Sequence, residues 1–304
     1  MMGESFNRSR KHGKSNLMKN FIKHIAISLL VIFILGIGSE QQTVQADTRL
    51  KITKQSALQQ GINDVAELES FLDGFVESNM EAYQIPGLAF ALVKDGELFF
   101  SKGYGYADVE NQIPVEPAKT VFRVGSVSKL VTAVTLMQVI EQGHLDLNTD
   151  INQYLSSTQS PNSYPEPVTI EHLLTHTAGF EDRIIGILAE DEAGVRPLGE
   201  FLADYFVARV YPTGTVHSYS NYSFTLAGQL VTEGSGIPFN QYVAENIFQP
   251  LEMPHSTFEQ PVPQARSSDV AIGYVKTGAG YEVGPDIYLQ IGPAGSLSTT
   301  AEDM

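Results

Sequence analysis

The chain has 304 residues, with 19 lysines and arginines against 35 aspartates and glutamates, and a net charge of -16 at pH 7. This length is enough for one large domain or two modest ones. Nucleic-acid binding relies on a clustered excess of Lys and Arg, so the acidic balance argues against a nucleic-acid partner. The sequence has no cysteine, which excludes disulfides, thiolate metal sites and cysteine nucleophiles.

The first 46 residues have the pattern of a targeting segment. Basic side chains precede an apolar run at 25–37, and Val44-Gln45-Ala46 then supplies small residues at the spacing of a cleavage site. The basic residues are Arg8, Arg10, Lys11, Lys14, Lys19 and Lys23. We therefore expect residues 1–46 to be a signal peptide, with an uncleaved signal anchor as the alternative. In both cases the positive-inside rule places the rest outside the cytoplasmic membrane, secreted or attached through residues 25–37.

The regular elements are expected in the following order. Residues 64–83 have the apolar spacing of an amphipathic helix that packs on a sheet and ends before Pro86. Two β-rich runs at 88–93 and 98–106 are joined by Asp95-Gly96, a dipeptide typical of tight hairpin turns. Further helices are predicted at 126–142, 170–175, 198–208, 222–233 and 239–248, and a second hairpin at 271–287.

The predicted helix that opens at Ser126 has apolar residues on most of its circumference. Only Thr132, Thr135 and Gln138 form a thin polar stripe before Gly143 ends it. We therefore expect this helix to be buried nearly all round. Its N-terminus, with unpaired backbone N–H groups and the positive end of the dipole, should reach the surface only at a cleft.

Ser126-Val127-Ser128-Lys129 places a hydroxyl and an amine three residues apart, on one face of a helix. A serine becomes a nucleophile when a neighbouring base takes its proton, and a desolvated lysine can act as that base. The alternative is a capping serine followed by a solvated lysine. A cation in the first turn opposes the helix dipole and gains nothing structurally, which favours a functional role for Lys129.

Tyr219-Ser220-Asn221 offers a phenol and an amide from one loop, after the turn Tyr211-Pro212-Thr213-Gly214. Tyr219 is suited to relay a proton, and Asn221 to hold a substrate carbonyl or amide. The alternative is a surface turn in which Asn221 is the N-cap of a helix.

Together these motifs resemble the serine β-lactamase and penicillin-binding-protein superfamily, and most closely its class C-like, esterase-like branch. The likeness runs from about Leu72 to the last residue and rests on the segments 122–129, 173–179, 219–221, 235–239, 250–253 and 293–299. It implies an α+β fold of the β-lactamase/DD-peptidase type, with an antiparallel sheet flanked by helices, a helical domain, and the site between them. By resemblance Ser126 is the acylated nucleophile, Lys129 and Tyr219 share general acid and base work, and Asn221 contacts substrate.

The predicted function is acyl transfer or hydrolysis at an amide or ester carbonyl, without a cofactor. A penicillin-binding peptidase, a β-lactamase-like enzyme and an esterase all fit, acting on a small-molecule or peptidoglycan-derived substrate. The alternative function is a non-catalytic β-lactam or peptidoglycan binder. His172 and His176 have a spacing that can bind zinc, but the glutamate of an H-E-x-x-H motif is absent between them, so we expect no metal.

The third motif of the superfamily, Lys or His before Thr and Gly, is expected on a strand after Pro293-Ala294-Gly295. This chain has Lys276-Thr277-Gly278 ahead of that segment, where the pattern predicts a hairpin turn. Residues 298–304 have the pattern of a helix N-cap and first turn. We therefore expect residues 47–304 to be an incomplete domain that lacks its C-terminal strands, inactive as a fragment.

Overall fold

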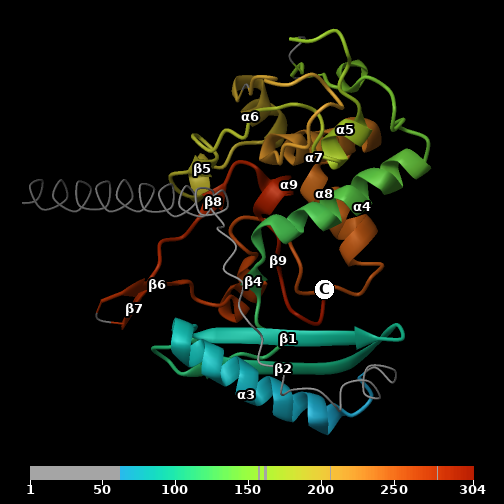
Figure 1. Ribbon diagram of the computed structural model, residues 1–304. Coiled ribbons are helices and arrows are strands. Elements are labelled where there is room, and N and C mark those ends of the chain that lie inside the picture. The colour runs from blue at the N-terminus through green and yellow to red at the C-terminus, as the bar shows by residue number, and fades with distance from the viewer. Residues whose placement is uncertain (1–61, 157, 161–162, 206, 279) are drawn as a thin grey trace, which may run out of the picture. The chain divides into compact units, whose positions relative to one another are not determined.

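The computed structural model describes residues 62–304 except 157, 161–162, 206 and 279 (Figure 1). The predicted signal peptide, its apolar run and the cleavage position lie outside the described residues. Within the described part, no helix has both the length and the apolar character needed to cross a membrane.

The described chain begins with a helix that packs on a sheet, as predicted. Helix α3 (Val65–Tyr83) starts at Asp64, whose carboxylate accepts the N–H groups of Ala66 and Glu67. The antiparallel sheet follows, with strands β1 (Gly87–Lys94), β2 (Glu97–Asp108) and β3 (Ile113–Pro114) in the order β1-β2-β3. Figure 1 shows α3 lying along β1 and β2.

The β1–β2 turn is the predicted Asp95-Gly96 turn. Both residues have positive φ angles, 54° and 84°, as a tight hairpin turn requires. A small core lies between α3 and the sheet, formed by Leu72 and Val76 of the helix and by Phe100 and Tyr104 of β2. Lys102 of β2 pairs with Glu69 at 2.6 Å and with Asp73 at 2.8 Å on the same helix.

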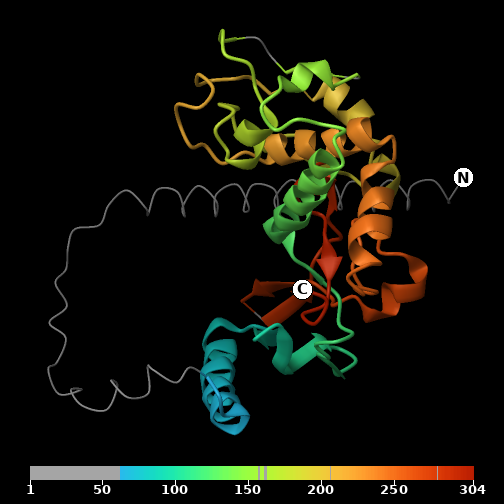
Figure 2. The same ribbon diagram turned by 90° about the vertical axis from the view of Figure 1, so that its right-hand side faces the viewer.

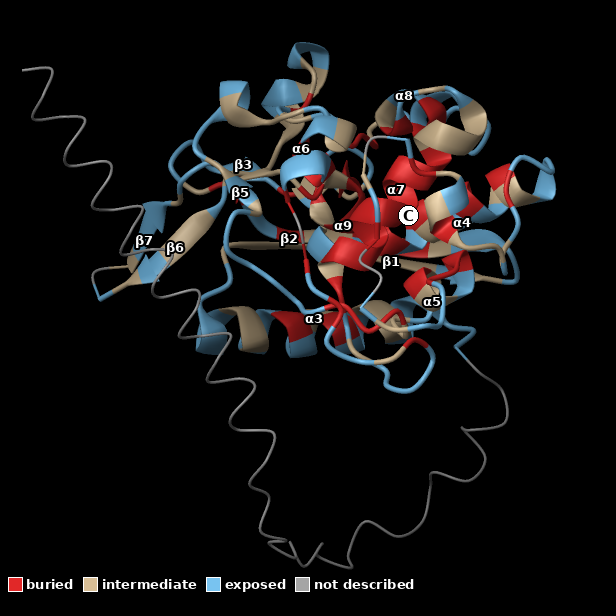
Figure 3. Cartoon of the chain, turned by 90° about the horizontal axis from the view of Figure 1, so that it is seen from above, coloured by how far each residue is buried: buried red, intermediate tan, exposed pale blue. Residues whose placement is uncertain are grey.

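The larger core belongs to the helices. These are α4 (Ser128–Glu141), α5 (Ile170–Leu174), α6 (Leu198–Asp204), α7 (Asn221–Ser235), α8 (Phe239–Val243) and α9 (Gly292–Gly295). Helix α7 is buried from Tyr222 to Val231, and Figure 3 shows it as a largely red element. The predicted helix at 198–208 is shorter in the structure, because Tyr205 leaves the helical conformation, with φ -92° and ψ 78°.

Three two-stranded sheets complete the fold of the described residues. Strand β4 (Phe122–Arg123) pairs with β9 (Ser298–Thr299), β5 (Leu188–Ala189) with β8 (Tyr288–Leu289), and β6 (Tyr274–Thr277) with β7 (Gly280–Val283), all antiparallel. The β6–β7 hairpin confirms that Lys276-Thr277-Gly278 leads into a turn. The β4–β9 pairing corrects the predicted helix start at Ser298, because this residue and Thr299 are strand residues.

Helix α4 is not buried nearly all round, so that prediction is wrong. Leu130, Val134 and Met137 form one face that is 43 to 60% exposed. The polar stripe is the buried side instead. Thr132 and Thr135 are fully buried because each hydroxyl donates to a backbone carbonyl at 2.7 Å.

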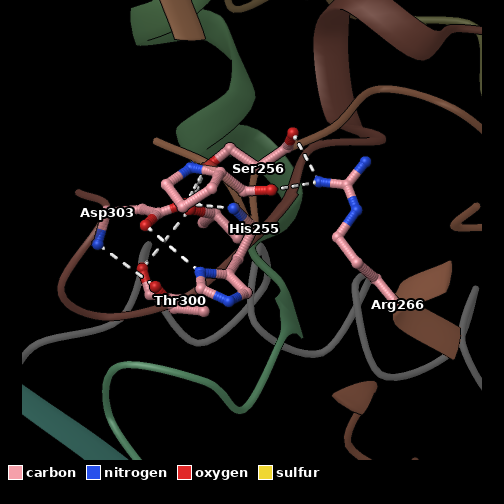
Figure 4. A network of polar contacts seen from close by, with 7 residues as sticks. His255, Ser256, Arg266, Thr300 and Asp303 are labelled. Carbon is pink, nitrogen blue, oxygen red and sulfur yellow. Dashed lines mark hydrogen bonds and ion pairs between the residues drawn. The ribbon is translucent and has the colours of Figure 1, made fainter. Parts of the chain in front are cut away.

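The last residues form a turn that is fixed by a network around Asp303 (Figure 4). The Asp303 carboxylate accepts the hydroxyl of Ser256 at 2.8 Å and the N–H of His255 at 2.9 Å. Its own N–H donates to the Thr300 hydroxyl at 3.1 Å, as in a helix N-cap, although the turn follows a strand. Arg266 donates to the Ser256 carbonyl at 3.2 Å. The network anchors the chain directly after β9, whose partner β4 leads into α4.

Candidate active site

The N-terminus of α7 presents two of the predicted site residues. Ser220 is the N-cap and its hydroxyl accepts the N–H of Ser223 at 3.1 Å. The cap is therefore Ser220 and not Asn221, the position considered from the sequence. Asn221 is the first residue of the helix, and its side chain does not cap the helix. Tyr219 directly precedes the cap residue Ser220.

The start of α4 presents the other two predicted site residues, Ser126 and Lys129. A single 3₁₀ turn, Gly125–Val127, carries Ser126 into the helix, and Gly125 takes a positive φ of 52°. The buried Ser128 hydroxyl donates to the Gly125 carbonyl at 2.5 Å and accepts the N–H of Leu297 at 3.0 Å. The turn that holds Ser126 is thus tied to the segment before β9.

The four predicted residues meet at these two helix starts. Lys129 Nζ donates to Ser126 Oγ at 3.2 Å, to Asn221 Oδ1 at 2.9 Å and to the Ala294 carbonyl at 2.7 Å. The Tyr219 hydroxyl donates to Ser126 Oγ at 2.9 Å. An ammonium group has three N–H donors, and here three oxygens surround it. The Ser126 oxygen is therefore in direct contact with both groups predicted to exchange its proton.

Lys129 is held away from water while Ser126 is exposed. The lysine is 7% exposed, and its Nζ lies 4.8 Å from the Tyr219 ring centroid and 5.8 Å from that of Phe224. These distances fall within the range of cation–π attraction. The structure therefore has a desolvated lysine at this position, and not the solvated lysine of the alternative.

Helix α9 supplies the third acceptor of Lys129 and lies beside α4. The Pro293 carbonyl accepts the hydroxyl of Thr132 at 2.7 Å, one residue before the Ala294 carbonyl that accepts from Lys129. Figure 2 shows α4 (green) running alongside the red C-terminal segment. On the other side, α7 approaches α9 at Gly228, where an added Cβ would lie 2.2 Å from Pro293 Cγ. A glycine at this point permits α9 to reach Lys129.

Two residues beside the site carry contacts that the sequence did not indicate. Asp182 Oδ1 accepts both the backbone and the side-chain N–H of Asn221 at 3.3 Å. His176 Nδ1 accepts the backbone N–H of Ser220 at 3.1 Å, and its ring centroid lies 4.6 Å from that of Tyr219. Burial, and then the charge of Lys129, lower the pKa of His176 below its usual 6.5. His176 lies in the segment 173–179 that contributes to the family resemblance, and its spacing from His172 suggested zinc, but neither signal assigned it a contact with the Tyr219 turn.

His172 and His176 each use a ring nitrogen within the protein. His172 Nδ1 accepts the N–H of Thr169 at 3.2 Å in a capping box at the start of α5. Among the described residues, no three His, Cys, Asp or Glu side chains cluster in a way that could hold a metal ion.

The arrangement is suited to acyl transfer by a serine. An exposed hydroxyl oxygen contacts a buried lysine and a tyrosine, and an amide stands beside them. The lysine as a neutral amine, or the tyrosine as a phenolate, can remove the serine proton and later return it. Two open hollows of about 480 and 420 Å³ lie elsewhere, the first along 163–167 and the second between Phe248 and Arg266. Neither hollow is lined by any of the four site residues. Because an active site needs a nucleophile and a base in contact, the region around the exposed Ser126 is the better candidate.

Comparison with known proteins supports the same interpretation. A beta-lactamase family model matches residues 72–304. Protein flp of Staphylococcus aureus (strain MW2) is 28% identical over 240 residues, covering 77% of this chain and 47% of the relative. The putative penicillin-binding protein PbpX of Bacillus subtilis (strain 168) is 30% identical over 220 residues, covering 70% of this chain and 51% of the relative.

The chain thus spans about half the length of the curated relatives it matches. Its helices and small antiparallel sheets agree with the α+β fold of β-lactamases and DD-peptidases. With the family model covering most of the chain and the Ser-x-x-Lys and Tyr-x-Asn residues meeting in one place, this protein belongs to the beta-lactamase family, a family of serine hydrolases.

Proposed function

We propose that this chain carries the acylation site of an exported serine hydrolase that acts on amide or ester carbonyls, with Ser126 as the nucleophile. The observation that carries the proposal is the double contact at Ser126 Oγ, 3.2 Å from Lys129 Nζ and 2.9 Å from the Tyr219 hydroxyl. A serine with two proton-exchanging groups in direct contact has the geometry of an activated nucleophile.

In the proposed reaction, Ser126 Oγ attacks the substrate carbonyl carbon while its proton passes to Lys129 in its neutral amine form or to Tyr219 in its phenolate form. The new C–O bond gives a tetrahedral oxyanion. When that intermediate collapses, the C–N bond of an amide or the C–O bond of an ester breaks, and the same proton is returned to the leaving nitrogen or oxygen. Attack by water, which gives a proton to the same pair of residues, then releases the acid and restores the serine.

Asn221 is proposed to contact the substrate from the start of α7. Its Oδ1 accepts from Lys129 and its Nδ2 donates to Asp182, so the carboxamide has a defined orientation. This orientation keeps an amide dipole beside Ser126, where a substrate carbonyl or amide can bind. No cofactor or metal is required by these steps.

Export and substrate class are part of the proposal. The basic and apolar pattern of residues 8–37 supports an extracytoplasmic location. The relative named as a putative penicillin-binding protein supports β-lactams or peptidoglycan peptides as ligands, while simple esters satisfy the same chemistry.

The test is to incubate the full-length protein with a labelled penicillin and, separately, with an aryl ester. The intact mass and the release of product are followed over time. Turnover of either compound supports a hydrolase, and a lasting adduct on Ser126 without turnover supports the alternative of a penicillin binder. A protein that neither forms an adduct nor turns over either compound would contradict the proposed function.

A further inference from the structure

One histidine supports the turn that carries Tyr219 and leads into Asn221. The His176 ring packs on Tyr219 with 4.6 Å between ring centroids, and its Nδ1 accepts the Ser220 N–H at 3.1 Å. Its backbone carbonyl accepts the N–H of Ser218 at 2.8 Å. Three successive residues of the turn, 218–220, are therefore each in contact with His176.

The backbone of His176 is in a conformation that usually belongs to glycine. Helix α5 ends with the N–H of His176 on the Leu173 carbonyl and that of Thr177 on the His172 carbonyl, and His176 takes a φ of 57°. This is a Schellman ending, in which the left-handed position is most often Gly. A histidine accepts conformational strain there, and its ring is directed to the Tyr219 turn.

The hydrogen bond defines the charge state of the ring. Nδ1 can accept the Ser220 N–H only when it carries no proton, so the imidazole is neutral with its proton on Nε2. The groups around it are Lys129 of α4, His217 and Tyr219 of the turn, and Asp182 of the preceding loop. Burial, Lys129 and His217 lower the pKa of His176, and Asp182 acts in the opposite direction.

We propose that His176 is a positioning residue whose neutral imidazole holds the 218–220 turn so that the Tyr219 hydroxyl stays on Ser126 Oγ. The consequence for rate rests on the proposed function, whereas the coupling between the ring and the turn does not. If Nδ1 takes up a proton, two N–H donors face each other and the hydrogen bond from Ser220 is lost. The protonated ring also places a second positive charge beside Lys129. The turn should then loosen, and Tyr219 should leave Ser126.

Two variants separate the two contacts. His176→Asn keeps an acceptor near the place of Nδ1 and tolerates a positive φ, but it removes the ring. His176→Phe keeps a ring against Tyr219 and removes the acceptor. We expect kcat to fall about 2- to 10-fold in His176→Asn, the scale of one aromatic contact. In His176→Phe we expect a fall of about 5- to 100-fold, because the Ser220 N–H loses its partner.

The control is His217→Asn, which removes an exposed imidazole that touches His176 but makes none of its bonds to the turn. This variant should keep the wild-type kcat. In the wild type, kcat should fall as the pH drops below 6.5 and His176 takes a proton. In His176→Asn this part of the fall should be absent, relative to the same variant at pH 7.5.

An NMR titration of the full-length protein tests the coupling without catalysis. The Ser220 amide and Tyr219 ring signals should shift with the same midpoint, below pH 6.5, as the His176 ring, in wild type and in His217→Asn. In His176→Asn that shared transition should disappear. The inference would be overturned if the Ser220 and Tyr219 signals did not change with pH as His176 titrates. A His176→Phe variant with the wild-type kcat and pH profile would also overturn it. If the coupling is seen in a protein that is never acylated, the proposed function fails and the positioning role stands.

Discussion

Lys129 and Ala294 are 165 positions apart in the sequence, yet Lys129 Nζ donates to the Ala294 carbonyl at 2.7 Å. The same nitrogen donates to Ser126 Oγ at 3.2 Å. The lysine of the Ser-x-x-Lys motif is therefore oriented by the short helix α9 as well as by its own helix. Changes that move α9 should reach the site without touching its side chains.

Gly228→Ala tests this link. The added Cβ would lie 2.2 Å from Pro293 Cγ and 2.5 Å from its Cβ, so α9 must shift. We expect the free energy of unfolding to fall by about 1–3 kcal/mol, as for overpacked cores, and the rate of acylation to fall with it. Urea unfolding and labelling with a penicillin measure the two effects.

The matched control is Gly74→Ala in α3, where an added Cβ meets no atom within 4 Å. This change should stabilise the protein by about 0.5–1 kcal/mol, because alanine loses less backbone entropy than glycine in a helix. Equal stability and equal acylation in Gly228→Ala and the wild type would show that α9 does not depend on the close approach.

Lys129→Met should slow acylation by about 10²- to 10⁴-fold, the usual range for loss of a general base or acid. Methionine fills a similar volume, so the fold should persist although the Ala294 carbonyl loses a donor. Circular dichroism checks the fold, and stopped-flow mixing with a labelled penicillin gives the rate. Lys276→Met, on the β6–β7 hairpin, should acylate as the wild type does, and a fast Lys129→Met variant would remove the lysine from the proposed chemistry.

Asp182→Ala should reduce acylation several-fold while leaving stability nearly unchanged. Asp182 is exposed and accepts two N–H groups of Asn221 at 3.3 Å, and single exposed contacts of this kind contribute about 1 kcal/mol or less. Without it the Asn221 carboxamide can rotate away from Lys129. The kinetics of Asp182→Asn, which retains one acceptor oxygen, should lie between those of wild type and Asp182→Ala, and a faster rate in Asp182→Ala would contradict this role.

The free energy of unfolding should fall as the pH drops below 6.5. The pKa values of His172 and His176 are lowered in the fold, mainly by burial, so the unfolded chain takes up protons first. Their contribution is complete above pH 6.5 and is lost as the pH falls through the lowered pKa values. Asp73 and Asp108 also have lowered pKa values, through hydrogen bonds from Lys102 and Asn111, but their stabilisation is lost only below about pH 4.

Urea unfolding at pH 7.5, 6.5, 5.5 and 4.5 checks this window. His176→Asn should show a smaller loss of stability between pH 6.5 and 4.5 than the wild type, because one of the two buried imidazoles is gone. A wild-type stability that rises on acidification through this range would contradict the prediction.

Local pattern was enough to predict α3, the β1–β2 hairpin with its Asp95-Gly96 turn, and the positions of α4 and α7. Pattern could not show which side of α4 is buried. Leu130 and Val134 are exposed although they are apolar, while Thr132 is buried and its hydroxyl donates to a carbonyl 161 residues away. The β4–β9 pairing was missed for the same reason, since each strand has two residues and the pairing is long-range.

The site, too, could be predicted only in part from local pattern. The spacing of Ser126 and Lys129 on one helix predicted their contact, but joining them to Tyr219 and Asn221 needed the resemblance to a family, since 93 positions separate Tyr219 from Ser126. The supporting contacts of His176 and Asp182 depend on backbone N–H groups of the Ser220 turn. Such groups carry no side-chain signal in a sequence.

Peptide mapping shows directly whether Ser126 is the acylated residue. The full-length protein and its Ser126→Ala variant are incubated with a labelled penicillin and an aryl ester, digested, and analysed by mass spectrometry. We expect one adduct, on the peptide that contains Ser126, and none in Ser126→Ala, whose circular dichroism should match the wild type. An adduct on another residue, or equal labelling of Ser126→Ala, would contradict it.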